Sequence, residues 1–181
     1  GSIPDFVGRY NVKFNSGGSM AFAAILRQLN IEQGALDTQE MGYGISWSGV
    51  VPVGDDDFKF TATYGDGLGR YLALNFANAA QLDAQGELET IKSYAGFISY
   101  RHWWNEKWRS SITLSGFNAD NDQRITAATS NKSSYSGYLN LLYSPSKPLT
   151  LGIEYMHAEN EKQNGYTGEL DRIIFSAKYV L

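Results

Sequence analysis

The feature of this sequence that most constrains its fold is an alternation of apolar and polar residues that continues over unusually long runs. Near the C-terminal end, Ile173 and Phe175 are apolar, whereas Arg172, Ser176 and Lys178 are polar. Comparable alternation covers residues 9–14, 58–64, 94–101, 108–115, 135–143 and 149–156, with weaker contrast in 20–31 and 41–53. This period of two predicts strands with two different faces. Many runs span about 9 to 13 residues, which exceeds the usual strand of soluble sheets and matches a tilted strand that crosses a bilayer.

Composition agrees with a membrane β-barrel and excludes several other classes. Aromatic residues make up 14% of the 181 residues, which excludes intrinsic disorder. No run of about 18 apolar residues could form a transmembrane helix, whereas a mean hydropathy of -0.33 suits strands with one lipid-facing side. The net charge of -4 argues against a general nucleic-acid binder. Because the chain has no Cys, it lacks disulfides, thiolate metal sites and a thiol nucleophile.

The connections between these strands alternate in kind. Tight, turn-forming stretches occupy residues 15–18, 54–57, 105–107 and 144–148. Longer polar stretches occupy residues 32–40, 118–132 and 159–168. Short turns on one side and long loops on the other are typical of outer-membrane barrels. The sequence therefore predicts an all-β fold, an antiparallel transmembrane β-barrel, with about nine or ten strands in this chain.

Residues 65–89 are the region where the number of strands is decided. Residues 69–77 could form a strand, but that strand would place the tight turn at 105–107 on the side of the long loops. We therefore expect 65–89 to be one long external loop that can fold into the pore, which leaves about nine membrane strands. A ten-stranded closure that uses 69–77 is the competing interpretation. Because single-chain bacterial barrels have even numbers of strands, nine strands indicate the C-terminal part of a larger barrel.

The polar face of the strands carries a strong bias of charge. If the apolar face contacts lipid, the opposite face lines the interior with eight cations: Arg9, Lys13, Arg27, Lys59, Arg101, Arg109, Arg172 and Lys178. Glu154 is the one clear acid expected among them, because most acidic residues fall in turns and loops. Basic walls of a water-filled pore attract anions, so we expect an anion-preferring channel. Alternatively, these cations only solvate the interior and pair with acids from other strands.

Aromatic residues at strand ends are a second sign of a membrane protein. Trp103, Trp104 and Trp108 flank one tight turn, and Tyr143 flanks another. Such rings favour the headgroup zone of a bilayer. The alternative is a soluble barrel or sandwich with aromatic turns.

Four stretches resemble the DcaP-like outer-membrane porins: Pro4–Tyr10, Thr63–Tyr71, Leu88–Tyr94 and Asp171–Tyr179. The resemblance covers residues 3–181 as a single β-barrel region, the C-terminal portion of a sixteen-stranded barrel, with Gly1-Ser2 interpreted as a remnant of cloning. It implies a homotrimer in the bacterial outer membrane that takes up small anionic solutes such as dicarboxylates. It also implies that Arg70 and Tyr71 lie in a loop that can narrow the pore. The chain ends in Leu181, whereas outer-membrane barrels usually end in an aromatic residue.

No residues of this sequence form a recognisable catalytic, cofactor or metal site. His102 and His157 lack the spacing of metal ligands, and no Ser lies in the setting of a nucleophile. We therefore expect passive diffusion without an enzymatic step. Two other functions remain open: a self-contained small barrel that binds one ligand, as lipocalins do, and a barrel that serves mainly as a membrane anchor.

Overall fold

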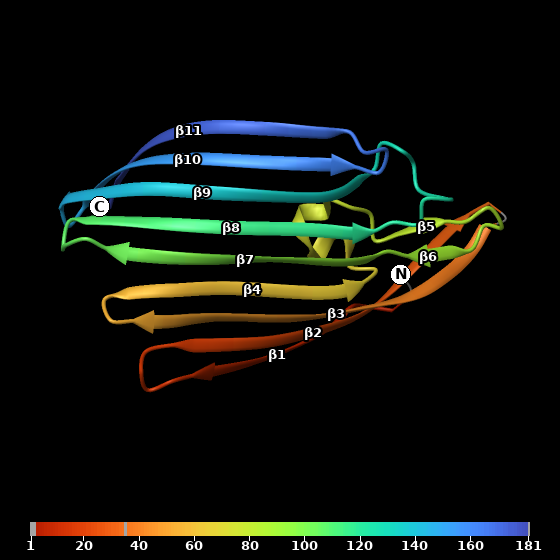
Figure 1. Ribbon diagram of the computed structural model, residues 1–181. Helices are drawn as coiled ribbons and strands as arrows, with labels where there is room; N and C mark the ends of the chain where they lie inside the picture. Colours follow the sequence, from red (N-terminus) through yellow and green to blue (C-terminus); the bar gives the residue numbers. More distant parts are fainter. Residues whose placement is uncertain (1–2, 35, 181) are drawn as a thin grey trace.

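A computed structural model describes residues 3–34 and 36–180 of the chain, and its fold is almost entirely antiparallel β-structure. Nine long strands of the described residues form one sheet in chain order (Figure 1). They are β1 (Phe6–Lys13), β2 (Ser19–Gln33), β3 (Leu36–Val53), β4 (Asp56–Asp66), β7 (Lys92–Trp103), β8 (Trp108–Asp120), β9 (Asn131–Ser146), β10 (Leu149–Lys162) and β11 (Thr167–Tyr179). The predicted all-β antiparallel fold is confirmed. The sheet is open, because β1 and β11 are its two edges.

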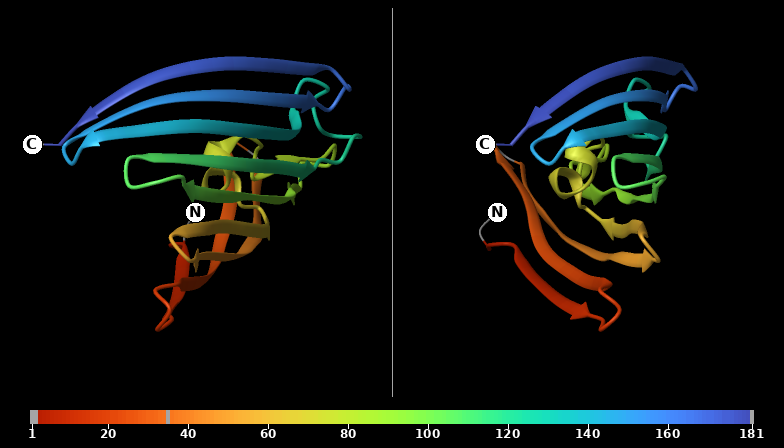
Figure 2. Two further views of the ribbon diagram at one scale, coloured as in Figure 1. Left: turned by 60° about the vertical axis from the view of Figure 1, so that its left-hand side comes forward. Right: turned by 90° about the vertical axis from the view of Figure 1, so that its left-hand side faces the viewer.

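The chain between β4 and β7 lies on the concave side of this curved sheet (Figure 2). It contains two 3-10 turns, η1 (Gly69–Tyr71) and η2 (Ala73–Asn75), and two short paired strands, β5 (Ala80–Leu82) and β6 (Leu88–Thr90). We call residues 67–91 the inner segment. The ten-stranded closure that used 69–77 is therefore wrong. Positive φ angles at Gly69 and at Ala73, Leu74 and Asn75 take this backbone out of the extended conformation that a strand requires.

The prediction of long loops at 32–40 and 159–168 is also wrong, because the strands continue into both stretches. Gln33 of β2 pairs with Leu36 of β3, and Glu161 of β10 pairs with Thr167 of β11. Backbone pairing does not require an apolar face, so the polar sequence of 32–40 and 159–168 did not indicate a loop.

The two faces of the sheet differ as the alternation predicts. Tyr94, Ile98, Leu139, Leu141 and Phe175 lie on the convex face, and Phe175 is 77% exposed. On the concave face, hydroxyl groups bond across neighbouring strands, as between Ser46 and Thr63, Ser99 and Thr113, and Ser115 and Ser136. The sheet therefore presents its apolar side outward and its polar side inward. No helix of the described residues is long and apolar enough to cross a membrane.

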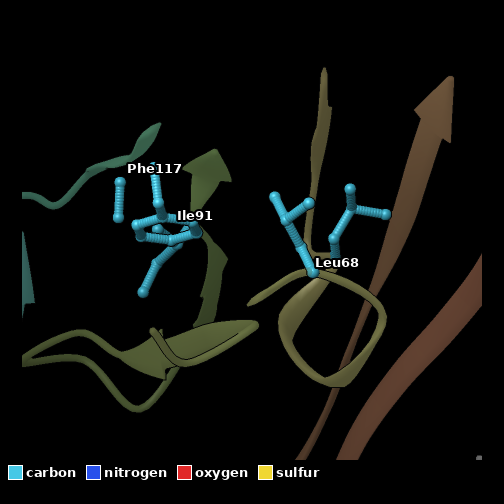
Figure 3. Packing of buried hydrophobic residues seen from close by; sticks show 5 residues of the cluster. Leu68, Ile91 and Phe117 are labelled. Carbon is cyan, nitrogen blue, oxygen red and sulfur yellow. The ribbon is translucent and has the colours of Figure 1, made fainter. Parts of the chain in front are cut away.

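The buried apolar core lies between the inner segment and the sheet. Its members are Leu68, Leu72 and Ile91 of the inner segment and Phe117 and Ala119 of β8 (Figure 3). Leu68 is 1% exposed. It packs where β3 and β4 carry glycine, since a Cβ atom at Gly44 would lie 2.6 Å from Leu68 Cδ2. The absence of side chains at these positions lets the inner segment dock closely on the sheet.

Gly42 of β3 provides a test of this close docking. A Cβ atom there would lie 2.9 Å from the Asp66 carbonyl oxygen and 3.2 Å from that of Gly67. Gly42→Ala should therefore lower the free energy of unfolding by about 1–3 kcal/mol, measured by urea titration of the refolded protein in detergent micelles. Gly168→Ala on β11 is the control, because nothing lies within 4 Å of its added methyl group. Equal stability of the two variants would contradict the docking.

Candidate functional site

The eight cations that were expected to line the interior of the barrel all lie on the concave face of the sheet. Arg27 identifies this face, because its Nη1 donates to the carbonyl oxygens of Gly67 and Leu68 in the inner segment, at 3.0 and 2.9 Å. Strand register then assigns the other cations to the same face, since their positions alternate with outward residues on every strand. The eight residues are Arg9, Lys13, Arg27, Lys59, Arg101, Arg109, Arg172 and Lys178.

Most of these cations gather near the tight turns. Lys13 and Lys178 lie at or next to the end of β1 and β11, and Arg109 is the second residue of β8. Lys59 and Arg101 lie close to the same end of β4 and β7. Arg27, by contrast, lies in the middle of β2 under the inner segment, where it is 8% exposed. The concave face thus has a basic zone at the tight-turn end and a separate buried cation at the inner segment.

An acid that sequence analysis missed, Asp57, balances part of this basic zone. Its carboxylate is paired with Arg101, and Lys59 Nζ lies 3.7 Å from Asp57 Oδ1. Asp57 is 7% exposed. The sequence analysis counted it in a turn, whereas β4 already begins at Asp56. Asp57 and Lys59 are two positions apart, and in a strand this spacing indicates that both side chains lie on the same face.

Five other cations of the concave face lack an acidic partner among the described residues. Arg9 donates to Asn11 Oδ1 at 2.9 Å, and Arg109 donates to Ser144 Oγ at 2.9 Å. Within residues 3–34 and 36–180, no acidic group lies within 4.0 Å of the charged groups of these five residues: Arg9, Lys13, Arg109, Arg172 and Lys178. This face therefore carries uncompensated positive charge. Glu154, the acid expected on this face, accepts a hydrogen bond from Asn140 rather than forming an ion pair with any of these five cations.

The aromatic residues at the β7–β8 turn divide between the two faces. Trp108 stacks on Tyr143 outside, with ring centroids 4.4 Å apart, and Trp104 is also exposed. Trp103, expected in the headgroup zone, instead lies with the concave cations: its ring centroid is 5.7 Å from Arg101 Cζ and 5.0 Å from Arg109 Cζ. Alternation along β7 explains this, because Trp103 shares parity with Arg101. Its ring supports both guanidinium groups by cation–π contact.

Arg70 and Tyr71, expected in a constricting loop, lie in η1 of the inner segment and are tied to the start of the sheet. Asp5 Oδ2 accepts a hydrogen bond from the Tyr71 hydroxyl at 2.5 Å and from Arg70 Nη2 at 2.9 Å. Arg27 Nε lies 3.9 Å from Asp5 Oδ1. Sequence analysis missed Asp5, because nothing local indicates that it contacts residues 65 or more positions away.

This arrangement suits the passage of hydrated ions better than a covalent reaction. The cations, hydroxyls and amides of the concave face are spread over many strands and do not converge on one reacting centre. No group of three or more His, Asp or Glu side chains in the described residues could hold a metal ion.

Comparison with solved structures matches this architecture to a channel. The crystal structure of the outer membrane channel DcaP of Acinetobacter baumannii superposes with a TM-score of 0.90 over 98% of this chain, at 21% sequence identity. The resemblance to DcaP is confirmed in the fold. The present chain spans 51% of that channel's length. A NanC porin structure matches at a TM-score of 0.48 and 12% identity. No protein-family model and no curated protein matches the sequence.

The pair formed by Asp57 and Arg101 leads to a prediction about stability. Arg101→Gln should lower the free energy of unfolding by about 1–3 kcal/mol, because it leaves the buried Asp57 carboxylate with only the more distant Lys59. Arg109→Gln is the control, since Arg109 bonds a neutral hydroxyl, and it should cost less than about 1 kcal/mol. The double variant Asp57→Asn/Arg101→Gln should recover part of the loss in urea unfolding. Similar costs for the two arginine variants would rule out the pairing as a stabilising contact.

The Asp5 contact leads to a prediction about protonation. The Tyr71 hydroxyl holds the pKa of Asp5 below its ordinary value of 3.8; Arg70 and Arg27 also lower this pKa, while burial opposes them. The contact therefore stabilises the fold above that ordinary value and is lost as pH falls through the lowered pKa.

Removal of the Tyr71 hydroxyl should raise the pKa of Asp5. The Tyr71→Phe variant can be titrated by carbon-13 NMR of the labelled carboxyl group. Tyr135→Phe is the control, because the Tyr135 hydroxyl bonds Glu159 on the convex face and not Asp5. An unchanged Asp5 titration in Tyr71→Phe would be inconsistent with this contact.

Proposed function

We propose that this chain forms about half of the wall of a DcaP-like porin in the bacterial outer membrane and that the pore passes small anionic solutes by diffusion. One observation carries the proposal: the sheet that matches the DcaP channel has an apolar convex face and a concave face on which five cations have no acidic partner among the described residues. An apolar outside and a polar, charged inside are what a water-filled transmembrane barrel requires.

The spacing of the aromatic residues on the convex face supports a membrane position. One group of tyrosines lies farther from the tight turns along its strands, and a second group, of Trp and Tyr, lies near the tight turns. Tyr94 in β7 and Trp104 directly after that strand are separated by about ten residues, the length that a tilted strand needs to cross the hydrocarbon core. The first group is Tyr43, Tyr64, Tyr94, Tyr135 and Tyr155; the second is Tyr100, Trp104, Trp108, Tyr143 and Tyr179.

The open edges of the sheet support assembly with further strands. Unpaired backbone groups of β1 and β11 would cost several kcal/mol each in lipid, so both edges need partners. In a sixteen-stranded barrel, seven strands outside this chain would supply them. By analogy with the family that the sequence resembles, three such barrels form a homotrimer, surrounded by outer-membrane lipid.

The identity of the cations supports small dicarboxylates as preferred solutes. Arginine presents a planar guanidinium group that can bond a carboxylate through two parallel hydrogen bonds. Arg9, Arg109 and Arg172 are free of acidic partners in the described residues, so they can interact with a passing carboxylate in turn. The low-dielectric wall of the barrel strengthens the attraction. The inner segment, with Arg70 and Tyr71, would narrow the path.

The convex position of the large apolar side chains disfavours a closed, ligand-binding barrel. A lipocalin-like protein encloses its apolar residues, whereas Leu139, Ile173 and Phe175 are exposed on the outside of this sheet. A role as a membrane anchor alone gives no reason for a bias of positive charge on the concave face.

Ion selectivity of the complete barrel tests the proposal. Arg109→Gln/Arg172→Gln should lower the permeability of chloride relative to potassium, by about twofold or more, because it removes two unpaired cations from the wall. The measurement is the reversal potential of single channels across a KCl gradient. Lys107→Gln/Lys147→Gln in the tight turns is the control, with the same loss of charge away from the concave wall. Unchanged selectivity in the arginine variant, or an equal change in the control, would count against an anion-selective pore.

A further inference from the structure

The inner segment is held at its N-terminal part by two separate kinds of contact. Leu68 and Leu72 are buried in the apolar core against the sheet. Between them, η1 turns Arg70 and Tyr71 toward Asp5, which lies directly before the edge strand β1. The polar contact thus joins the segment to the first strand of the sheet, about 65 positions away along the chain.

Asp5 is the shared acceptor of this contact. Its carboxylate takes the hydrogen bonds of Tyr71 and Arg70, while Arg27 Nε lies 3.9 Å away. The two guanidinium groups also lie by the Tyr71 ring, with Arg27 Cζ 5.2 Å and Arg70 Cζ 5.0 Å from its centroid. Two cations therefore share one carboxylate, so the cluster keeps a net positive charge that Asp5 reduces.

We propose that Asp5 is a specificity-determining residue of the pore: it fixes η1 against the wall and screens the charge of Arg27 and Arg70. The part of this inference that concerns selectivity rests on the function proposed above. The part that concerns the position of η1 does not. Loss of the carboxylate frees Arg70 and Tyr71 from β1 and exposes both guanidinium groups to a passing anion.

Arg27 remains in place when the carboxylate is lost. It keeps its bonds to the Gly67 and Leu68 carbonyl oxygens, which do not involve Asp5. Removal of Asp5 therefore moves η1 locally and leaves the start of the inner segment docked. The charge at this point of the wall rises while the supporting strand is unchanged.

A chemical probe measures the position of η1 without any assumption about transport. Because the chain has no Cys, a single Leu72→Cys substitution gives one reactive thiol beneath η1. Asp5→Asn keeps the size of the side chain and removes its charge. It should raise the rate of reaction of the thiol at position 72 with N-ethylmaleimide by about tenfold or more, because charge-assisted hydrogen bonds are lost.

A matched position in the same inner segment serves as the control. Leu88 is as buried as Leu72, but its backbone N–H bonds Thr38 Oγ1 at 3.2 Å and has no contact with Asp5. Asp5→Asn should leave the reaction of Leu88→Cys unchanged. An unchanged rate at position 72 would overturn the proposal, and so would an equal acceleration at both positions, since the second outcome means that the whole segment has loosened.

Electrical recording of the complete barrel tests the specificity. Asp5→Asn should raise the chloride-to-potassium permeability ratio, because Arg27 and Arg70 lose their counter-charge. Asp171→Asn is the control: it removes the same charge from a carboxylate on the convex face, where the Tyr155 hydroxyl bonds Asp171, so it should leave that ratio nearly unchanged. An unchanged ratio in Asp5→Asn would overturn the role in specificity. A barrel that conducts no ions at all would instead refute the proposed function, while the thiol rates would still decide whether Asp5 holds η1.

Discussion

The continuous antiparallel ladder of backbone hydrogen bonds determines on which face of the sheet each side chain of a strand lies. Successive residues of a strand point to opposite faces, so a slip of one residue between neighbouring strands would move all cations of one strand to the convex side. Tight turns prevent such a slip: at the β1–β2 turn, the Phe14 N–H donates to the Gly18 carbonyl oxygen at 2.8 Å. The separation of charged and apolar faces is therefore a consequence of strand register, maintained turn by turn.

The inner segment provides the buried packing that a single-layer sheet lacks. Leu68, Ile91 and Phe117 are buried because residues 67–91 cover part of the concave face, whereas the opposite face has no covering layer in the described residues. Glycines at positions 42, 44 and 65 allow this close approach. Arg27 would be costly to bury alone, but it satisfies two carbonyl oxygens of the segment. The same residue thus belongs to the basic face and to the support of the segment.

Sequence patterns predicted what depends on local periodicity and missed what depends on distant pairing. Nine strands and the shared face of the eight cations follow from alternation within each strand, as for Arg109 and Arg172. Asp57 was missed because the end of the turn was placed two residues too far along the chain, at 57, whereas β4 begins at Asp56. Trp103 was misplaced because its aromatic character was given more weight than the alternation it shares with Arg101. The contact of Asp5 with Arg70 depends on how an irregular segment folds back across the sheet. No period in the sequence encodes that path.

The two missed acids change how the basic face is understood. Asp57 pairs with Lys59 and Arg101 near the tight turns, and Asp5 contacts Arg27 and Arg70 at the inner segment. In the proposed pore, the unpaired cations therefore lie along a wall whose other basic groups are already partly neutralised. Passage through a channel requires sites that attract an ion yet release it. A wall with every cation unpaired would bind a dicarboxylate at many points, whereas spaced single arginines allow it to pass from one to the next.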